Sequence, residues 1–181
     1  METKRIILSG GGTGGHIYPA ISIANEILFR DKNTEILFVG AKNKMEMNIV
    51  PKYGFSILGL WISGINRNNF LKNILVPIKL FISVFQSLLI VKRFSPNVII
   101  GTGGYASGPI LYVANLLKIP TLIQEQNSYP GITNKLLSKK VNTVCVAYNY
   151  LDKYFPKDKI KLTGNPVRSS ITENSNYFEK G

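Results

Sequence analysis

Ser9-Gly10-Gly11-Gly12-Thr13-Gly14-Gly15-His16-Ile17-Tyr18-Pro19 is the stretch that decides the fold. An apolar run typical of a buried parallel strand, residues 6–8, precedes it, and a one-sided helical pattern of apolar residues follows it. We expect Pro19 in the first turn of that helix, where its missing N–H has no cost. The glycines therefore lie between a strand and a helix, where bare backbone and the helix dipole favour an anion.

The first glycine loop does not by itself identify the anion. Gly10-x-Gly12-x-x-Gly15 matches the dinucleotide fingerprint, but that fingerprint also needs an acid at the end of the second strand. Gly40-Ala41-Lys42 follows the second predicted strand, which disfavours NAD. A nucleotide-triphosphatase loop would carry lysine where His16 stands, which disfavours ATP hydrolysis. A tight turn without a ligand remains the alternative.

The same plan occurs again at residues 98–109, where an apolar strand runs into a second glycine loop, Gly101 to Gly104. Thr13-Gly14-Gly15-His16 corresponds to Thr102-Gly103-Gly104-Tyr105, and a proline follows each stretch. The carboxyl ends of parallel strands can face one crevice. The pair of loops therefore predicts a shared site for a diphosphate.

Composition narrows the class of ligand. The 181 residues include 22 Lys and Arg against 10 Asp and Glu, a formal net charge of +12. Such a field suits nucleic acid, an anionic membrane surface or phosphate-bearing substrates, and the absence of a nucleic-acid motif predicts no nucleic-acid partner. Cys145 is the only cysteine, so we expect a small buried residue in a reducing compartment. Residues 1–5 lead directly into the first strand, which predicts no signal peptide.

The remaining pattern alternates strands with helices. Strands are predicted at residues 4–9, 34–39, 55–58, 97–100, 121–123, 142–147 and 160–162. Helices are predicted at about 17–30, 42–51, 70–93, 106–117 and 130–138. This alternation predicts an α/β fold, a Rossmann-like doubly wound parallel sheet, in one domain over residues 1–168. Residues 169–181 are polar and are expected to be a linker or a frayed end.

The 70–93 stretch carries more apolar residues than a helix packed on a sheet needs. Polar interruptions argue against a transmembrane span, and four of them, Lys72, Lys79, Gln86 and Arg93, recur every seven residues. A narrow polar stripe and basic ends predict a helix lying on an anionic membrane, with a helix buried in the core as the alternative. The expected membrane-docking residues are Arg67, Lys72, Leu75, Lys79, Phe81, Phe85 and Arg93.

Polar residues follow the fifth strand at the edge where ligands bind in this architecture. Glu125 could act as a base, and Gln126 and Asn127 suit sugar hydroxyls, although a solvated loop is an equal alternative. His16, the only histidine, stands at a helix start within the anion loop, where it could transfer a proton or contact phosphate. No cluster has metal-ligand spacing, so we expect no protein-bound metal.

Four motifs in this order resemble the lipid I N-acetylglucosaminyltransferases of bacterial peptidoglycan synthesis, in glycosyltransferase family 28. They are residues 11–20, residues 101–109, residues 125–127 with 133–135, and residues 164–168. The resemblance runs from about residue 4 to residue 168. It implies a GT-B fold without a cofactor, of which this chain is the N-terminal, acceptor-binding half. By the same resemblance we expect the C-terminal donor-binding domain to lie outside this chain and the isolated half to be inactive.

The resemblance implies an inverting transfer of N-acetylglucosamine from UDP-GlcNAc to the C4 hydroxyl of the N-acetylmuramoyl sugar of lipid I. The product is lipid II, formed on the cytoplasmic side of the cell membrane by a peripheral enzyme. Positions matching the family's catalytic candidates are His16 and Glu125, and the choice of base between them stays open. Positions matching its donor contacts are Thr13, Gly14, Gly15, Asn127 and Arg168. Positions matching its acceptor-diphosphate site are Gly12, Gly103, Gly104, Tyr105 and Ser107.

Two further classes of function remain open at this point. A non-catalytic membrane-anchoring subunit of a split glycosyltransferase would have the same glycine loops and the same basic, apolar helix. A nucleotide-dependent oxidoreductase is disfavoured by the missing acid after the second strand. The sequence does not indicate an oligomeric state.

Overall fold

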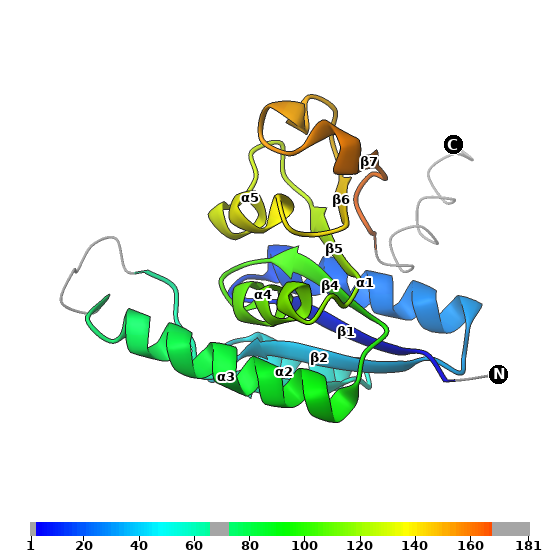
Figure 1. The fold of residues 1–181 in the computed structure, drawn as a ribbon. Coiled ribbons are helices and arrows are strands. Elements are labelled where there is room, and N and C mark those ends of the chain that lie inside the picture. Colours follow the sequence, from blue (N-terminus) through cyan, green and yellow to red (C-terminus); the bar gives the residue numbers. More distant parts are fainter. Residues whose placement is uncertain (1–2, 66–72, 168–181) are drawn as a thin grey trace, which may run out of the picture.

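The computed structural model describes residues 3–65 and 73–167. Its strands form one sheet in the order β3-β2-β1-β4-β5-β6-β7, and every neighbouring pair is parallel (Figure 1). The strands are β1 (Arg5–Gly10), β2 (Glu35–Ala41), β3 (Ser56–Leu60), β4 (Val98–Gly103), β5 (Thr121–Glu125), β6 (Thr143–Val146) and β7 (Ile160–Leu162). The predicted Rossmann-like parallel sheet is therefore confirmed.

Helices cover both faces of the sheet. They are α1 (Gly14–Arg30), α2 (Glu46–Lys52), α3 (Val76–Phe94), α4 (Ser107–Leu116) and α5 (Ile132–Ser138), with short 3-10 turns at Leu151–Lys153 and Lys157–Lys159. Along β1, Ile7 joins the core formed with α3 and α4, whereas Leu8 joins the core formed with α1 and α2. Successive strand side chains point to opposite faces, so one apolar run supplies both cores.

The start of α1 differs from the prediction. The Thr13 carbonyl accepts hydrogen bonds from the N–H groups of His16, at 3.1 Å, and Ile17, at 3.3 Å, so the helix begins at Gly14. The expectation that Pro19 occupies the first turn was wrong, because it lies further inside the helix. Apolar periodicity cannot register glycines, which have no side chain, and so it placed the start too late.

Other predicted boundaries also differ from the structure. Helix α2 begins at Glu46, four residues later than the start of the predicted range 42–51, and ends at Lys52. Strand β5 extends to Glu125, so this residue belongs to the sheet and not to the polar loop that was predicted. Cys145 is half-buried in β6 rather than fully buried, and burial raises the pKa of its thiol. The predicted linker, residues 169–181, lies outside the described residues.

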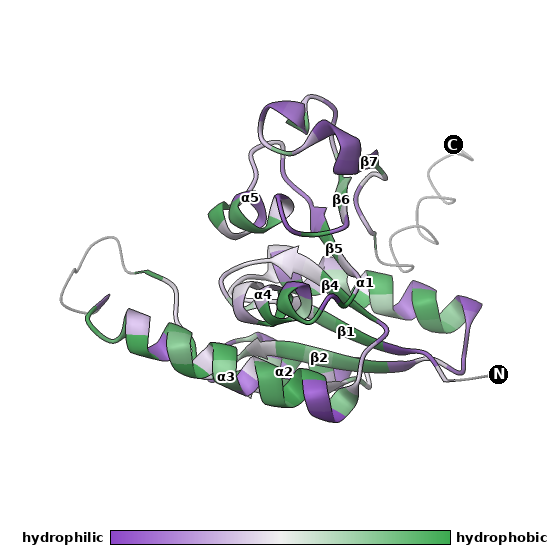
Figure 2. Ribbon diagram, in the orientation of Figure 1, coloured by the Kyte–Doolittle hydropathy of each residue, from purple (hydrophilic) through white to green (hydrophobic). Residues whose placement is uncertain are grey.

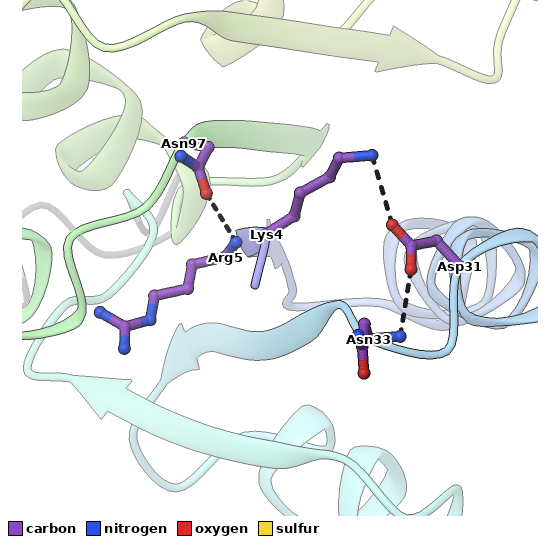
Figure 3. A network of polar contacts seen from close by, with 5 residues as sticks. All are labelled: Lys4, Arg5, Asp31, Asn33 and Asn97. Atoms are coloured by element: carbon purple, nitrogen blue, oxygen red, sulfur yellow. Dashed lines mark hydrogen bonds and ion pairs between the residues drawn. The ribbon is translucent and has the colours of Figure 1, made fainter. Parts of the chain in front are cut away.

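The amino edge of the sheet, where the strands begin, is fastened by surface polar contacts (Figure 3). The backbone N–H of Arg5 donates to Asn97 Oδ1 at 2.7 Å, which ties the start of β1 to the segment before β4. Lys4 Nζ lies 3.3 Å from Asp31 Oδ2, and the backbone N–H of Asn33 donates to Asp31 Oδ1 at 3.1 Å. The hydrogen bond from the Asn33 N–H lowers the pKa of Asp31 most, and the contact with Lys4 has the next largest effect.

A groove of about 580 Å³ lies at the same amino edge, between the end of α3 and strands β2 and β3. Its lining is mainly apolar, with Arg5, Glu35 and Arg93 as the charged members. None of its lining residues belongs to either glycine loop.

Candidate functional site

The strand order reverses between β1 and β4, which are neighbours although β2 and β3 follow β1 in the chain. Open α/β sheets bind ligands outside the carboxyl ends of their strands at such a reversal. Strand β1 ends at Gly10 and β4 ends at Gly103, so both glycine loops lie at this point. The topology therefore selects the carboxyl edge between β1 and β4 as the candidate site.

The two glycine loops touch each other. The Gly11 N–H donates to the Gly103 carbonyl at 3.4 Å, and Thr102 Oγ1 donates to the His16 carbonyl at 2.7 Å. A Cβ at Gly104 would lie 2.2 Å from the Gly11 carbonyl oxygen, so only glycine permits this approach. The predicted convergence of the loops is confirmed by these contacts, whereas their binding of a diphosphate stays a prediction.

His16 lies in the first turn of α1, against the second loop. Its Nδ1 lies 3.0 Å from the Thr102 carbonyl oxygen. A carbonyl can only accept, so Nδ1 carries the proton in the neutral ring and Nε2 keeps a lone pair. A Cβ at Gly103 would lie 2.8 Å from Nδ1, so this glycine makes room for the imidazole. The geometry thus leaves Nε2 able to accept a proton from a substrate.

Glu125 is 1% exposed, and hydrogen bonds occupy both of its carboxylate oxygens. Oε1 accepts from the backbone N–H and the side-chain Nδ2 of Asn127, each at 3.0 Å. Oε2 accepts from the Gly131 N–H at 3.1 Å and from Asn134 Nδ2 at 2.9 Å. In this arrangement Glu125 fastens the loop between β5 and α5.

The amides that were expected to face sugar hydroxyls are partly engaged within the protein. Gln126 Nε2 donates to the Thr102 carbonyl at 2.9 Å, the same oxygen that His16 contacts. Asn127 is exposed, but its Nδ2 is held by Glu125. Three buried atoms of this network, Gln124 Nε2, Gln126 Oε1 and Asn134 Oδ1, have no hydrogen-bond partner within the described residues.

Glu46 is a member of the site that sequence reasoning missed. It is fully buried, and its carboxylate accepts the Gly12 N–H at 3.1 Å and the Ala41 N–H at 3.0 Å. Gly12 was predicted to bind a diphosphate, but its N–H is already engaged from inside the protein. The signal that could have found Glu46 is weak: it is the only acid between the second and third strands.

The other predicted contacts differ in how open they are. Thr13 is exposed and its side chain does not cap α1, while Gly14 and Gly15 form the first turn of that helix, whose N–H groups lack intrahelical partners. Tyr105 is half-buried beside Gly12, and burial, then the charge of Glu46, raises its pKa. Ser107 is buried and donates to the Gly104 carbonyl at 2.9 Å, so it supports the loop instead of facing a ligand. Arg168 lies outside the described residues.

Helix α3 exposes apolar side chains to solvent along its length. In Figure 2 most of its ribbon has the colour of hydrophobic residues. Phe81 is 77% exposed and Phe85 57%, whereas the serines Ser83 and Ser87 are fully buried beneath them. The alternative of a helix enclosed in the core is therefore wrong. No helix in the described residues is long and apolar enough to cross a membrane.

The polar stripe on α3 has an unexpected role. Lys79 Nζ donates to Ser63 Oγ at 3.3 Å and lies 5.7 Å from the centre of the Trp61 ring. Gln86 Oε1 accepts a hydrogen bond from the backbone N–H of Trp61 at 2.8 Å. These two residues thus fasten the segment after β3 to the helix. Leu75 and Arg93 are exposed, and two further predicted docking residues, Arg67 and Lys72, lie outside the described residues.

The described residues contain no group of three or more His, Cys, Asp and Glu side chains that could hold a metal ion.

Comparison with known proteins identifies the family of this chain. The glycosyltransferase family 28 N-terminal domain matches residues 6–146. The UDP-N-acetylglucosamine–N-acetylmuramyl-(pentapeptide) pyrophosphoryl-undecaprenol N-acetylglucosamine transferase of Flavobacterium psychrophilum is 61% identical over 171 residues, which are 94% of this chain and 47% of that protein. The Cytophaga hutchinsonii protein of the same name is 56% identical over 175 residues, 97% of this chain and 47% of its own length.

Solved structures support the same family and fold. The crystal structure of Acinetobacter baumannii MurG matches 94% of this chain and 48% of its own chain, at 28% identity and a TM-score of 0.77. A UDP-GlcNAc 2-epimerase from Neisseria meningitidis shares the fold alone, at 14% identity and a TM-score of 0.66. The chain spans about half the length of the curated relatives it matches.

Proposed function

This chain belongs to glycosyltransferase family 28, and we propose that it is the acceptor-binding half of an enzyme that moves N-acetylglucosamine from UDP-GlcNAc to lipid I. The observation that carries the proposal is the contact between the two glycine loops, with the His16 ring between them, where the strand order reverses. The names of the relatives supply the identity of the two substrates.

The acceptor diphosphate would bind at the first turn of α1 and at the second glycine loop. Gly14 and Gly15 offer backbone N–H groups at the positive end of the helix dipole. Gly103 and Gly104 have positive φ angles of 105° and 80°, which turn the second loop tightly around the imidazole. A net charge of +12 adds a field that attracts a pyrophosphate-linked substrate.

His16 would act as the general base of a single inverting displacement. Its Nε2 takes the proton from the C4 hydroxyl of the N-acetylmuramoyl sugar as the hydroxyl oxygen bonds to C1 of N-acetylglucosamine. The bond between C1 and the UDP oxygen breaks, and UDP leaves with the electron pair. The Thr102 carbonyl supports this role because it holds the proton on Nδ1.

His16→Asn tests the base in a chain extended to the full length of its relatives. The Asn amide can still donate to the Thr102 carbonyl, but it has no basic nitrogen, so we expect kcat to fall by roughly 10² to 10⁴ with little change in Tm. Turnover of UDP-GlcNAc with a soluble lipid I analogue is the measurement. Undiminished transfer would remove His16 from catalysis.

The donor would reach the same edge from the other half of the enzyme. The Thr13 hydroxyl is exposed and makes no cap hydrogen bond, and the Asn127 amide is held in place by Glu125. Together with Arg168 these residues are the proposed donor contacts of this half, whereas Gly14 and Gly15, which the family resemblance assigns to the donor, are proposed here for the acceptor diphosphate. Glu125 then acts by positioning Asn127 and not as the base.

Helix α3 would hold the protein peripherally on the cytoplasmic face of the membrane, close to lipid I. Its outward apolar residues, together with Arg93 at its basic end, suit the interface of an anionic bilayer. Phe81→Ser combined with Phe85→Ser should abolish sedimentation with phosphatidylglycerol vesicles. Phe29→Ser is the matched control, because Phe29 is 82% exposed but lies on α1. Equal binding by the double variant would contradict docking through α3.

A further inference from the structure

We propose that Glu46 is a positioning residue that closes the first glycine loop to phosphate from within the protein. A diphosphate is thereby directed away from Gly12, to the first turn of α1 and the second glycine loop. The inference deepens the proposed function, on which the identity of the diphosphate ligand rests.

Glu46 is built into the loop as its internal anion. Its side chain is fully buried. Oε2 accepts the N–H of Gly12, and Oε1 accepts the N–H of Ala41 at the end of β2. One carboxylate thus bridges the first glycine loop and the neighbouring strand, and a phosphate oxygen at Gly12 would have to displace it.

The Glu46 side chain requires glycine at two neighbouring positions, Gly11 and Gly40. A Cβ at Gly11 would lie 2.2 Å from Glu46 Oε1, and a Cβ at Gly40 would lie 2.5 Å from Glu46 Cγ. Both backbones approach the side chain more closely than any other residue would permit. The glycine pattern therefore serves an internal carboxylate as well as an external ligand.

The charge of Glu46 also disfavours a second anion at this point. Glu46 belongs to none of the ion pairs found within residues 3–65 and 73–167, and backbone N–H groups of Gly12 and Ala41 donate to its carboxylate. The Tyr105 ring lies beside Gly12, and burial, then the nearby Glu46 carboxylate, raises the pKa of its phenol. A phosphate at Gly12 would meet the same repulsion.

This arrangement separates the chain from dinucleotide-binding proteins. Their corresponding loop gives its backbone to the pyrophosphate, and their acid after the second strand binds a ribose. In this chain the acid that follows the second strand, Glu46, is buried, and its carboxylate accepts the Gly12 N–H. Glu46 therefore disfavours dinucleotide binding by occupying the Gly12 N–H, in addition to the missing acid at the end of the second strand.

Glu46→Gln tests the proposal in the ¹⁵N-labelled 181-residue chain. The glutamine side chain has only one accepting oxygen. We expect this oxygen to accept the Ala41 N–H, because Ala41 is buried and an unpaired buried N–H costs more free energy than one at half-exposed Gly12. The Gly12 N–H therefore loses its partner. Without any ligand, the Gly12 amide proton should move upfield in the variant. Glu26→Gln removes a surface carboxylate paired with Arg30 and should leave that resonance in place. No movement in Glu46→Gln would overturn the inference.

Titration with inorganic pyrophosphate provides the second measurement. In the unmodified chain the Gly14 and Gly15 amides should move and the Gly12 amide should not. In Glu46→Gln the Gly12 amide should move as well, and the dissociation constant should fall about tenfold, the effect of one added charge-assisted hydrogen bond. General structural damage would weaken binding instead, and Glu26→Gln should leave it unchanged.

The outcomes separate the two proposals. Movement of Gly12 together with Gly14 in the unmodified chain, or weaker binding by Glu46→Gln, would overturn the role of Glu46. If no glycine amide moved in the unmodified chain, the proposed diphosphate site would fail, while the ligand-free shift of Gly12 would still decide the role of Glu46.

Discussion

At the carboxyl edge of the sheet, Glu46 and Glu125 are 0% and 1% exposed, and each accepts hydrogen bonds from backbone N–H groups. At the amino edge, Asp31 and Glu35 have side chains that are 39% and 53% exposed and pair with Lys4 or Arg5. Both edges thus use carboxylates, but one edge encloses them and the other leaves them in water.

The difference teaches what each edge can tolerate. Removing a buried carboxylate leaves its donors without partners, at roughly 1 to 3 kcal/mol for each group. Removing an exposed ion pair changes the free energy of unfolding by about 0 to 1 kcal/mol. The candidate site is therefore held in place from inside the protein, before any ligand arrives, whereas the amino edge can vary.

The largest effect should come from Glu125→Ala. Its four hydrogen bonds come from backbone and amide donors, among them the buried side chain of Asn134. We expect the free energy of unfolding in urea to fall by about 3 to 5 kcal/mol. Glu35→Ala at the amino edge is the control and should cost less than about 1 kcal/mol. Similar losses in the two variants would erase the contrast between the edges.

A smaller effect is expected from alanine at two glycines with positive φ. Gly104 (φ 80°) lies at the carboxyl edge, and Gly54 (φ 82°) lies in the turn that leads into β3 at the amino edge. A Cβ at Gly54 would meet no atom within 4 Å, so Gly54→Ala should cost only the strain of a left-handed backbone, about 1 to 2 kcal/mol. Gly104→Ala adds a clash with the Gly11 carbonyl and should cost more.

Urea unfolding of the two glycine variants isolates that clash, because the backbone angle is matched. The Gly104 variant should also shift the His16 imidazole resonances, since a Cβ there would lie 3.2 Å from His16 Cδ2. If the two variants had equal free energies of unfolding and the His16 resonances did not shift, the close contact between the two loops would not contribute to stability.

The smallest effect is expected from Asp31→Asn at the amino edge. The Asn33 N–H and Lys4 lower the pKa of Asp31 in the folded protein. A lowered folded pKa contributes stability that is present above the unfolded pKa, near 4, and is lost as pH falls through the folded value. The variant should thus melt slightly below the unmodified chain at pH 7 and together with it at about pH 2. An equal gap at both pH values would contradict this origin.

Much of the fold followed from pattern. The apolar runs of β1, β2 and β4 and their alternation with helices predicted a parallel sheet, and the paired glycine loops predicted the edge at which the two loops meet. The surplus of apolar residues on α3 correctly indicated an outward apolar face. Such signals are local, because burial on both faces of a strand or exposure on one side of a helix is written in neighbouring residues.

The roles of individual polar residues did not follow in the same way. Glu125 was predicted to be a loop carboxylate, Lys79 a membrane-docking cation and Gly12 an open N–H donor, yet each has a partner in the fold. The partner of Gly12 is Glu46, which is 34 residues away in the chain. The periodicity of apolar residues in the sequence does not predict hydrogen bonds between residues that are brought together only by the folded sheet.

The sequence by itself determined the fold class, the edge of the sheet where the glycine loops meet and the family of the chain, because strand burial, glycine spacing and motif order are properties of short segments. Only the tertiary structure decided which polar groups remain free for a ligand. That choice depends on which donors and acceptors the parallel crossovers place within hydrogen-bonding distance, and a buried polar group takes whatever partner it finds there.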